Sequence, residues 1–167
     1  LGALYLRFFS GGSPGDPPDL ERIARGAGLV NHLLADFPVQ MIVETHDALV
    51  RSDDILALEQ RLDGHLNILW DIAHTHNHGG ETWQETYQRL GHSIRYLHVK
   101  DTRRQGDRIV NTSLYSGELD LPGLLRFFQQ RPESIIVSLE WEKMWDPTLG
   151  PGDLAARDFM GRIRDLQ

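Results

Sequence analysis

Five short apolar runs alternate along the chain with five segments whose apolar residues recur every three or four positions. Short apolar runs bounded by turn residues are typical of β-strands, and the three-to-four spacing is typical of amphipathic helices. The expected strands cover residues 3–9, 41–44, 66–70, 94–98 and 135–140. The expected helices begin near Pro18, Ser52, Trp83, Asp120 and Asp153. The pattern therefore predicts a β-strand followed by a helix, five times over.

The predicted helices carry recognisable start signals. Ser52 is expected to be the N-cap of the second helix, with Asp53 and Asp54 favourable in its first turn. Asp120, with Pro122 behind it, marks the start of the fourth helix. The last helix is expected to turn four residues inward: Ala156, Phe159, Met160 and Ile163.

Two connections show no clear helical or strand period. Residues 75–80 read Thr-His-Asn-His-Gly-Gly, which predicts a solvated loop rather than a second metal site at His76 and His78. Residues 102–117 are expected to form a long loop in which Ile109 and Val110 pair briefly. A loop of this length in a compact domain is more often functional than idle.

Strands that alternate with helices indicate parallel β-α units and an α/β fold. Two architectures contain five such units: an open doubly wound sheet, or a (β/α)8 TIM barrel without three of its units. Length alone favours the open sheet. However, the turn after the first strand, residues 10–15, contains neither a dinucleotide-binding fingerprint nor a P-loop.

Composition narrows the functional classes. The 167 residues are enough for one ordinary domain, which we expect to span 1–167. The chain has no cysteine, which excludes disulfides and thiolate metal sites and is consistent with a cytoplasmic protein. No apolar run reaches the roughly 20 residues that span a bilayer, so no membrane partner is expected. The net charge of −7 argues against a nucleic-acid partner.

Candidate chemistry lies where four consecutive predicted strands end, at Glu44, Asp71, His98 and Glu140. Three carboxylates and one imidazole suit Mn²⁺, Mg²⁺, Fe²⁺ or Zn²⁺. The strand ends of a barrel surround one rim, so these ligands can meet on one ion there more easily than in an open sheet. Taken singly, a carboxylate at a strand end is usually a turn or cap residue, and His98 would be a hydrogen-bonded core histidine.

Four short motifs then support a family resemblance. They occur in order along the chain: Val43-Glu44-Thr45-His46, Asp71-Ile72-Ala73-His74, His98-Val99-Lys100-Asp101 and Ser138-Leu139-Glu140-Trp141-Glu142. Together they resemble the xylose isomerase-like TIM barrel superfamily, specifically its sugar phosphate isomerase/epimerase branch. Gly117-Glu118-Leu119-Asp120 is also similar to that branch. The resemblance extends over residues 1–167.

The resemblance implies a (β/α)8 barrel of which this chain supplies the last five β-α units, with about 90 amino-terminal residues absent. An incomplete record, a shortened protein or a second chain that closes the barrel would each account for this. Residues 3–9 and 135–140 would then be exposed apolar edges, which favour association, including a homo-oligomer.

The resemblance also implies site residues. Glu44, Asp71, His98 and Glu140 would bind one divalent metal ion, and His74 would contact the substrate. Arg103 or Arg104 lies near where some epimerases place an arginine on a substrate oxygen. Lys100 and Asp101 match a recurring pair whose role is either positional or substrate-facing. A solvated loop pair is an equally good interpretation of the two arginines.

The activity implied is isomerisation or epimerisation of a small-molecule sugar, sugar phosphate or polyol. Glu44 and Glu140 would move the proton to and from a metal-stabilised enediolate. The alternatives are an inosose-type dehydratase on the same metal site, a non-catalytic truncated barrel, and an endonuclease IV-like DNA repair enzyme. The last alternative is disfavoured, because the expected Asp-x-His element reads Asp107-Arg108-Ile109.

Overall fold

A computed structural model describes residues 2–131 and 135–165 of the chain, so the outermost residues of the expected 1–167 domain lie outside the described part. The chain divides into two compact units, Leu1–Tyr96 and Leu97–Gln167. Each unit is described in turn. Among the described residues, no helix combines the length and the apolar character that crossing a membrane would need.

All five predicted strands are confirmed, and they form one sheet in the order β1-β2-β3-β4-β7. Their bounds are β1 Tyr5–Phe8, β2 Gln40–Glu44, β3 Ile68–Asp71, β4 Ile94–Val99 and β7 Ile136–Leu139. In the first unit β1, β2 and β3 pair in parallel, with Leu6 opposite Met41 and Glu44 opposite Leu69. The strand order follows the chain without the reversal that defines a doubly wound sheet. The sheet is therefore that of a partial (β/α)8 barrel, and the open-sheet alternative is not supported.

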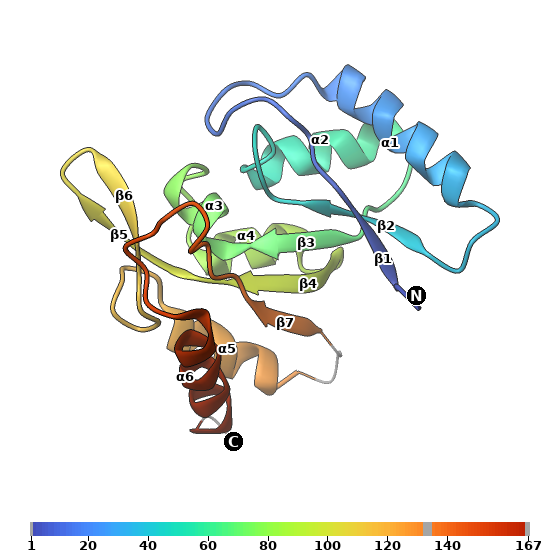
Figure 1. The fold of residues 1–167 in the computed structure, drawn as a ribbon. Coiled ribbons are helices and arrows are strands. Elements are labelled where there is room, and N and C mark those ends of the chain that lie inside the picture. The colour runs from blue at the N-terminus through green and yellow to red at the C-terminus, as the bar shows by residue number, and fades with distance from the viewer. Residues whose placement is uncertain (1, 132–134, 166–167) are drawn as a thin grey trace. The chain divides into compact units, whose positions relative to one another are not determined.

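The first unit contains four helices: α1 Leu20–Leu34, α2 Ser52–Leu62, α3 Ile72–Asn77 and α4 Trp83–Leu90. Helix α1 packs against β2 and beside α2, as Figure 1 shows. The predicted apolar stripe of α1 is confirmed, since Ile23 and Ala27 are buried. Burial of such stripes against the sheet supplies most of the free energy that keeps short helices folded.

The start of α2 differs from its prediction. Ser52 is the first helical residue rather than the N-cap, and Arg51 at the cap position makes no side-chain cap. Ser52 is buried, and both its backbone N–H and its hydroxyl donate to Glu81 Oε1 at 2.8 Å. The carboxylate that satisfies this helix end therefore comes from the segment that precedes α4.

The prediction of a solvated loop at residues 75–80 is wrong for its first half, because α3 extends from Ile72 to Asn77. The carboxylate of Asp71 accepts hydrogen bonds from the backbone N–H groups of Ala73 and His74, at 2.8 and 3.1 Å. An aspartate N-cap of this kind stabilises the first turn of a helix. The cap explains why a polar segment becomes helical directly after a strand.

The second unit contains an antiparallel hairpin and two helices, α5 Leu121–Gln129 and α6 Gly152–Asp165. The hairpin strands, β5 Asp101–Gln105 and β6 Arg108–Thr112, lie in the region 102–117 that was expected to be a loop. Gln105 is opposite Arg108, and Gly106 with φ of +62° is the first residue of the two-residue turn. The long-loop prediction is wrong, although the pairing at Ile109 and Val110 is confirmed.

The two helix starts predicted in this unit are confirmed. Asp120 is the N-cap of α5 and accepts from the backbone N–H of Gly123. In α6 only part of the expected inward face is buried: Phe159 is 8% exposed, whereas Met160 is 48% exposed and Ala156 is also exposed. Helix α6 therefore presents a narrower buried face than its sequence predicts.

Candidate functional site

Two of the predicted metal ligands, Glu44 and Asp71, lie together in the first unit. Glu44 is the last residue of β2 and Asp71 is the last residue of β3, which are neighbouring parallel strands. Their carboxylates are 1% and 0% exposed, and an oxygen of each lies within 4.8 Å of the other. Two buried carboxylates at this separation repel each other unless a cation compensates their charge.

Hydrogen bonds orient the Asp71 carboxylate. Its Oδ1 accepts the two N–H groups at the start of α3, so the side chain cannot rotate freely. Thr45 joins the two strand ends, since its hydroxyl donates to Asp71 O and accepts from Asp71 N. The ends of the two strands that carry these carboxylates are therefore joined by hydrogen bonds.

Arg7 is a charged neighbour of Glu44 that the sequence analysis missed. Its Nη1 lies 3.2 Å from Glu44 Oε2, and its guanidinium also stacks over the Phe9 ring at 4.5 Å. The arginine extends from β1, beside β2. An arginine in the middle of an otherwise apolar strand was the available signal for a role at the site.

His74, the predicted substrate-contacting residue, lies beside Asp71. Its Nε2 is 3.5 Å from Asp71 Oδ2, and the side chain is 13% exposed. The His46 ring stacks on it with 4.4 Å between ring centroids, and Phe9 contacts His46 edge-on. The carboxylates of the first unit are thus bordered by rings that can donate hydrogen bonds and pack against a ring or carbon chain.

The other two predicted ligands, His98 and Glu140, lie together in the second unit. His98 is on β4 and Glu140 directly follows β7, whose backbone is joined to β4 by the Glu140 N–H to Val99 O bond. His98 Nδ1 is 3.6 Å from Glu140 Oε1. Each unit therefore carries, within itself, two ligand-type side chains at adjacent strand ends.

Lys100 is the main charge partner of Glu140. Its ammonium Nζ lies 2.9 Å from Glu140 Oε2 and 3.4 Å from Glu142 Oε1, and its side chain is only 7% exposed. A buried lysine between two carboxylates is positioned by them and holds them in place in return. Glu142, at 27% side-chain exposure, is thereby tied to Glu140 through the same ammonium group.

The remaining predicted residues separate into one positional residue and two exposed ones. Asp101 is 1% exposed and accepts backbone N–H groups from Thr102 and Gly117, both at 2.9 Å, which is a positional role. Arg103 and Arg104 are exposed on β5. The backbone N–H of Arg104 donates to Glu118 Oε1 at 3.0 Å.

The donor chemistry fits a divalent cation. The first unit offers two buried carboxylates that repel each other, and the second offers an imidazole beside a carboxylate. Oxygen ligands with one nitrogen are compatible with Mg²⁺, Mn²⁺, Fe²⁺ and Zn²⁺. The site residues therefore permit metal binding without distinguishing among these ions.

A family model described as "Xylose isomerase-like TIM barrel" matches residues 1–166. No curated protein matches the sequence. The family match covers nearly the whole chain and agrees with the order of the strands in the sheet.

Several solved structures are similar at low identity, and they include the following three. A probable 3-DHS dehydratase, AsbF of Bacillus anthracis, is 19% identical with a TM-score of 0.69, over 83% of this chain and 57% of that one. A xylose isomerase-like TIM barrel protein from Mycobacterium smegmatis in complex with magnesium is 12% identical with a TM-score of 0.68, over 98% and 60%. The IOLI protein, which has a bound zinc atom, is 18% identical with a TM-score of 0.64, over 99% and 62%.

These structures support the fold and a divalent metal in general, since one contains magnesium and another zinc. The chain spans less than two thirds of the length of each of them.

Proposed function

Because this chain belongs to the xylose isomerase-like TIM barrel family, we propose that it is part of a metal-dependent enzyme that isomerises or epimerises a small sugar or sugar phosphate. The observation that carries the proposal is the pair of buried carboxylates, Glu44 and Asp71, at the C-terminal ends of neighbouring strands. In TIM barrels this end of the strands carries the chemistry, whereas the opposite end contributes to stability.

In this proposal Glu44, Asp71, His98 and Glu140 hold one divalent ion, which is Mn²⁺, Mg²⁺, Zn²⁺ or Fe²⁺. The pairing of ligand-type residues within each unit and the strand order support this grouping. When bound, such an ion supplies Lewis acidity that lowers the cost of negative charge on adjacent substrate oxygens.

The protein's own residues carry the proton transfers. One of the two glutamates, Glu44 or Glu140, removes the proton from the carbon beside the substrate carbonyl, and the other returns a proton to a different face or carbon. The first glutamate then ends the turnover protonated and the second ionised, so exchange with water restores the starting state. Positioned acid-base groups of this kind contribute about 10²–10⁴-fold in rate.

Two cations hold these glutamates in place. Arg7 contacts Glu44, and Lys100 lies between Glu140 and Glu142. We propose that His74 donates a hydrogen bond to a substrate oxygen, with Lys100 and the exposed Arg103 and Arg104 contributing positive charge toward a substrate phosphate. The imidazole of His74 lies beside Asp71 and is 13% exposed, which supports its part in this assignment.

Exchange of Glu140 for glutamine tests the proton-transfer role. Glu140→Gln keeps the shape and the contact with Lys100 but removes the base, so we expect kcat to fall by about 10²-fold or more while the fold is retained. Turnover would be measured on a panel of ketoses and aldoses, after metal content has been determined by mass spectrometry. Glu142→Gln is the matched control because Glu142 also contacts Lys100, and it should retain most of the activity. Full activity of Glu140→Gln would contradict the assignment.

An inosose-type dehydratase is the second candidate, supported by the similarity to a structure described as a probable dehydratase. The same residues would remove the proton next to a carbonyl, and a neighbouring hydroxyl would then leave as water. Product analysis separates the two functions: an isomerase or epimerase conserves substrate mass, whereas a dehydratase yields a product lighter by one water.

A further inference from the structure

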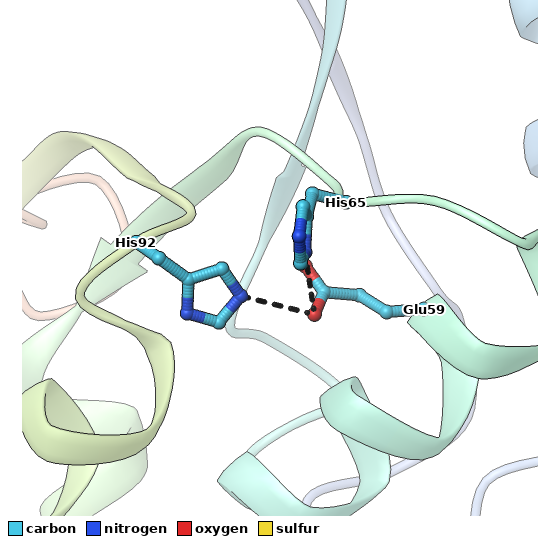
Figure 2. A group of neighbouring side chains, drawn as sticks. All are labelled: Glu59, His65 and His92. Atoms are coloured by element: carbon cyan, nitrogen blue, oxygen red, sulfur yellow. Dashed lines mark hydrogen bonds and ion pairs between the residues drawn. The ribbon is translucent and has the colours of Figure 1, made fainter.

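Glu59, His65 and His92 form a second group of ligand-type side chains, at the opposite ends of the strands from Asp71. Glu59 lies in the last turns of α2, His65 precedes β3, and His92 precedes β4. All three belong to the first unit. Figure 2 shows both imidazole rings next to the Glu59 carboxylate, and the two rings contact each other edge-on with 4.6 Å between their centroids.

The local backbone brings these residues together. Helix α2 ends at Asp63, whose φ of 52° is left-handed, and the N–H groups of Asp63 and Gly64 both donate to Glu59 O. This sharp exit turns the chain back past the helix end, so His65 lies next to the side chain of Glu59. His92 approaches from the connection between α4 and β4.

The two oxygens of the Glu59 carboxylate have different contact partners. Oε1 accepts the backbone N–H of Leu66 at 2.9 Å and the hydroxyl of Ser93 at 2.6 Å. Oε2 faces the two histidines, at 3.6 Å from His65 Nδ1 and 3.4 Å from His92 Nε2. The carboxylate is therefore buried and held rigidly by donors on one side, while its second oxygen points at two imidazole nitrogens.

The two contacts to Glu59 have the spacing of ligands in a tetrahedral metal site. Ligands about 2.0–2.1 Å from a tetrahedral ion lie roughly 3.3–3.4 Å from one another. One ligand atom from each residue lies within 4.8 Å of the other two, and both contacts to Glu59 are close to the tetrahedral separation. Both histidine side chains are exposed, at 75% for His65 and 42% for His92.

We propose that Glu59 Oε2, His65 Nδ1 and His92 Nε2 bind a first-row transition-metal cation, with Zn²⁺ as the reference ion and water in the fourth position. Two imidazoles and one carboxylate favour Zn²⁺, Co²⁺, Ni²⁺ or Cu²⁺ over Mg²⁺ and Ca²⁺, which prefer oxygen ligands. Hydrogen bonds that orient a ligating carboxylate are typical of metal sites in proteins. The bound ion joins the end of α2 to the starts of β3 and β4 and so stabilises this end of the sheet.

Zinc titration of the wild-type protein and of the double variant His65→Ala/His92→Ala tests the proposal. The titration is done calorimetrically with saturating Mg²⁺ present, which limits binding at the oxygen-rich residues of the strand C-terminal ends. We expect the double variant to bind one equivalent of Zn²⁺ fewer, with affinity at this site reduced more than about 100-fold. His32→Ala is the matched control, because His32 is an exposed histidine on α1, and it should bind zinc like the wild type.

The zinc anomalous signal in crystals of the wild-type protein gives a second measurement that does not depend on a variant. A peak bounded by Glu59, His65 and His92 is expected. Equal zinc stoichiometry in wild type and double variant, or no peak at Glu59, would show that the histidines only form ion pairs with Glu59 and would overturn the proposal. Because the stoichiometry is compared between variants, the outcome is independent of whether Glu44 and Asp71 bind metal.

Discussion

At the scale of single residues, Asp71 combines a structural and a chemical task in one side chain. One oxygen caps α3, and the carboxylate as a whole lies beside Glu44 and His74. An aspartate that caps a helix would by itself explain the sequence pattern at this strand end. Capping does not explain why a second buried carboxylate, that of Glu44, lies so close to Asp71. This proximity is the reason to propose a metal ion.

Glu59 provides a prediction about acid stability. Burial acts to raise its pKa, but hydrogen bonds from Ser93, Leu66 and His92 outweigh burial and lower the pKa below the ordinary value of 4.5. A carboxyl group with a lowered pKa stabilises the fold above its unfolded-state pKa, and this contribution is lost as the pH falls through the folded-state pKa. Glu59→Ala should therefore lower the free energy of unfolding by about 1–3 kcal/mol at pH 7 and by clearly less at pH 3.

Urea denaturation at both pH values, with a chelator present, checks this prediction. Glu21→Ala is the control, because Glu21 is 82% exposed on α1 and should change the stability by less than about 0.5 kcal/mol at either pH. An equal effect of Glu59→Ala at pH 7 and pH 3 would contradict the expected pH dependence.

At the scale of secondary-structure elements, the start of α2 depends on a carboxylate from another segment. Glu81 accepts two hydrogen bonds from Ser52 and one from the hydroxyl of Thr86 at 2.7 Å. We expect Glu81→Ala to lower the free energy of unfolding by about 1–3 kcal/mol, and Ser52→Ala to cost less because the backbone bond to Glu81 remains. Thermal and urea denaturation would show which of the two variants loses more stability. A larger loss for Ser52→Ala than for Glu81→Ala would contradict the main role given to Glu81 at this helix end.

The hairpin of β5 and β6 is held to the following segment through Asp101. A Cβ atom added at Gly117 would lie 2.1 Å from Asp101 Oδ1 and 2.3 Å from Thr102 O. Gly117→Ala should therefore destabilise the protein by more than about 1 kcal/mol. Gly161→Ala in α6 is the comparison, because an added Cβ meets nothing within 4 Å there, and it should stabilise by about 0.4–1 kcal/mol. Chemical denaturation of the two variants should show opposite signs.

At the scale of the whole molecule, the first strand of the sheet exposes apolar side chains. β1 is at one end of the strand order, and Leu4, Leu6 and Phe9 at this edge are 65%, 47% and 43% exposed. An exposed apolar edge strand is a template for pairing with another strand. We expect concentration-dependent self-association of this chain, measured by sedimentation velocity, with a lysine at the edge reducing it.

Leu6→Lys should shift the distribution toward monomer, whereas Leu29→Lys should leave it unchanged. Leu29 is 66% exposed on α1 and is not part of a strand. Both variants therefore replace an exposed leucine with lysine, and only the position of the substitution differs. If both variants associate like the wild type, the β1 edge is not the contact.

Most of the strands and helices, and the candidate ligands at the strand ends, could be predicted from local patterns in the chain. Apolar period and capping residues act within one element, so β2, β3 and the Asp120 cap of α5 were predictable from local pattern. The strand ends at Glu44 and Asp71 were predictable for the same reason. The hairpin of β5 and β6 could not be predicted from such a pattern. Its polar strands are stabilised by pairing with each other rather than by a buried face.

Contacts between side chains that are distant in the chain could not be predicted in this way, because they arise when the elements pack together. Glu81 replaces the expected cap from 29 residues away, and Glu59 meets His92 across 33 residues. Arg7 reaches Glu44 because β1 and β2 are neighbours in the sheet. Contacts of this kind depend on strand order and on the direction in which each helix leaves its strand, and neither is encoded in the period of a single segment.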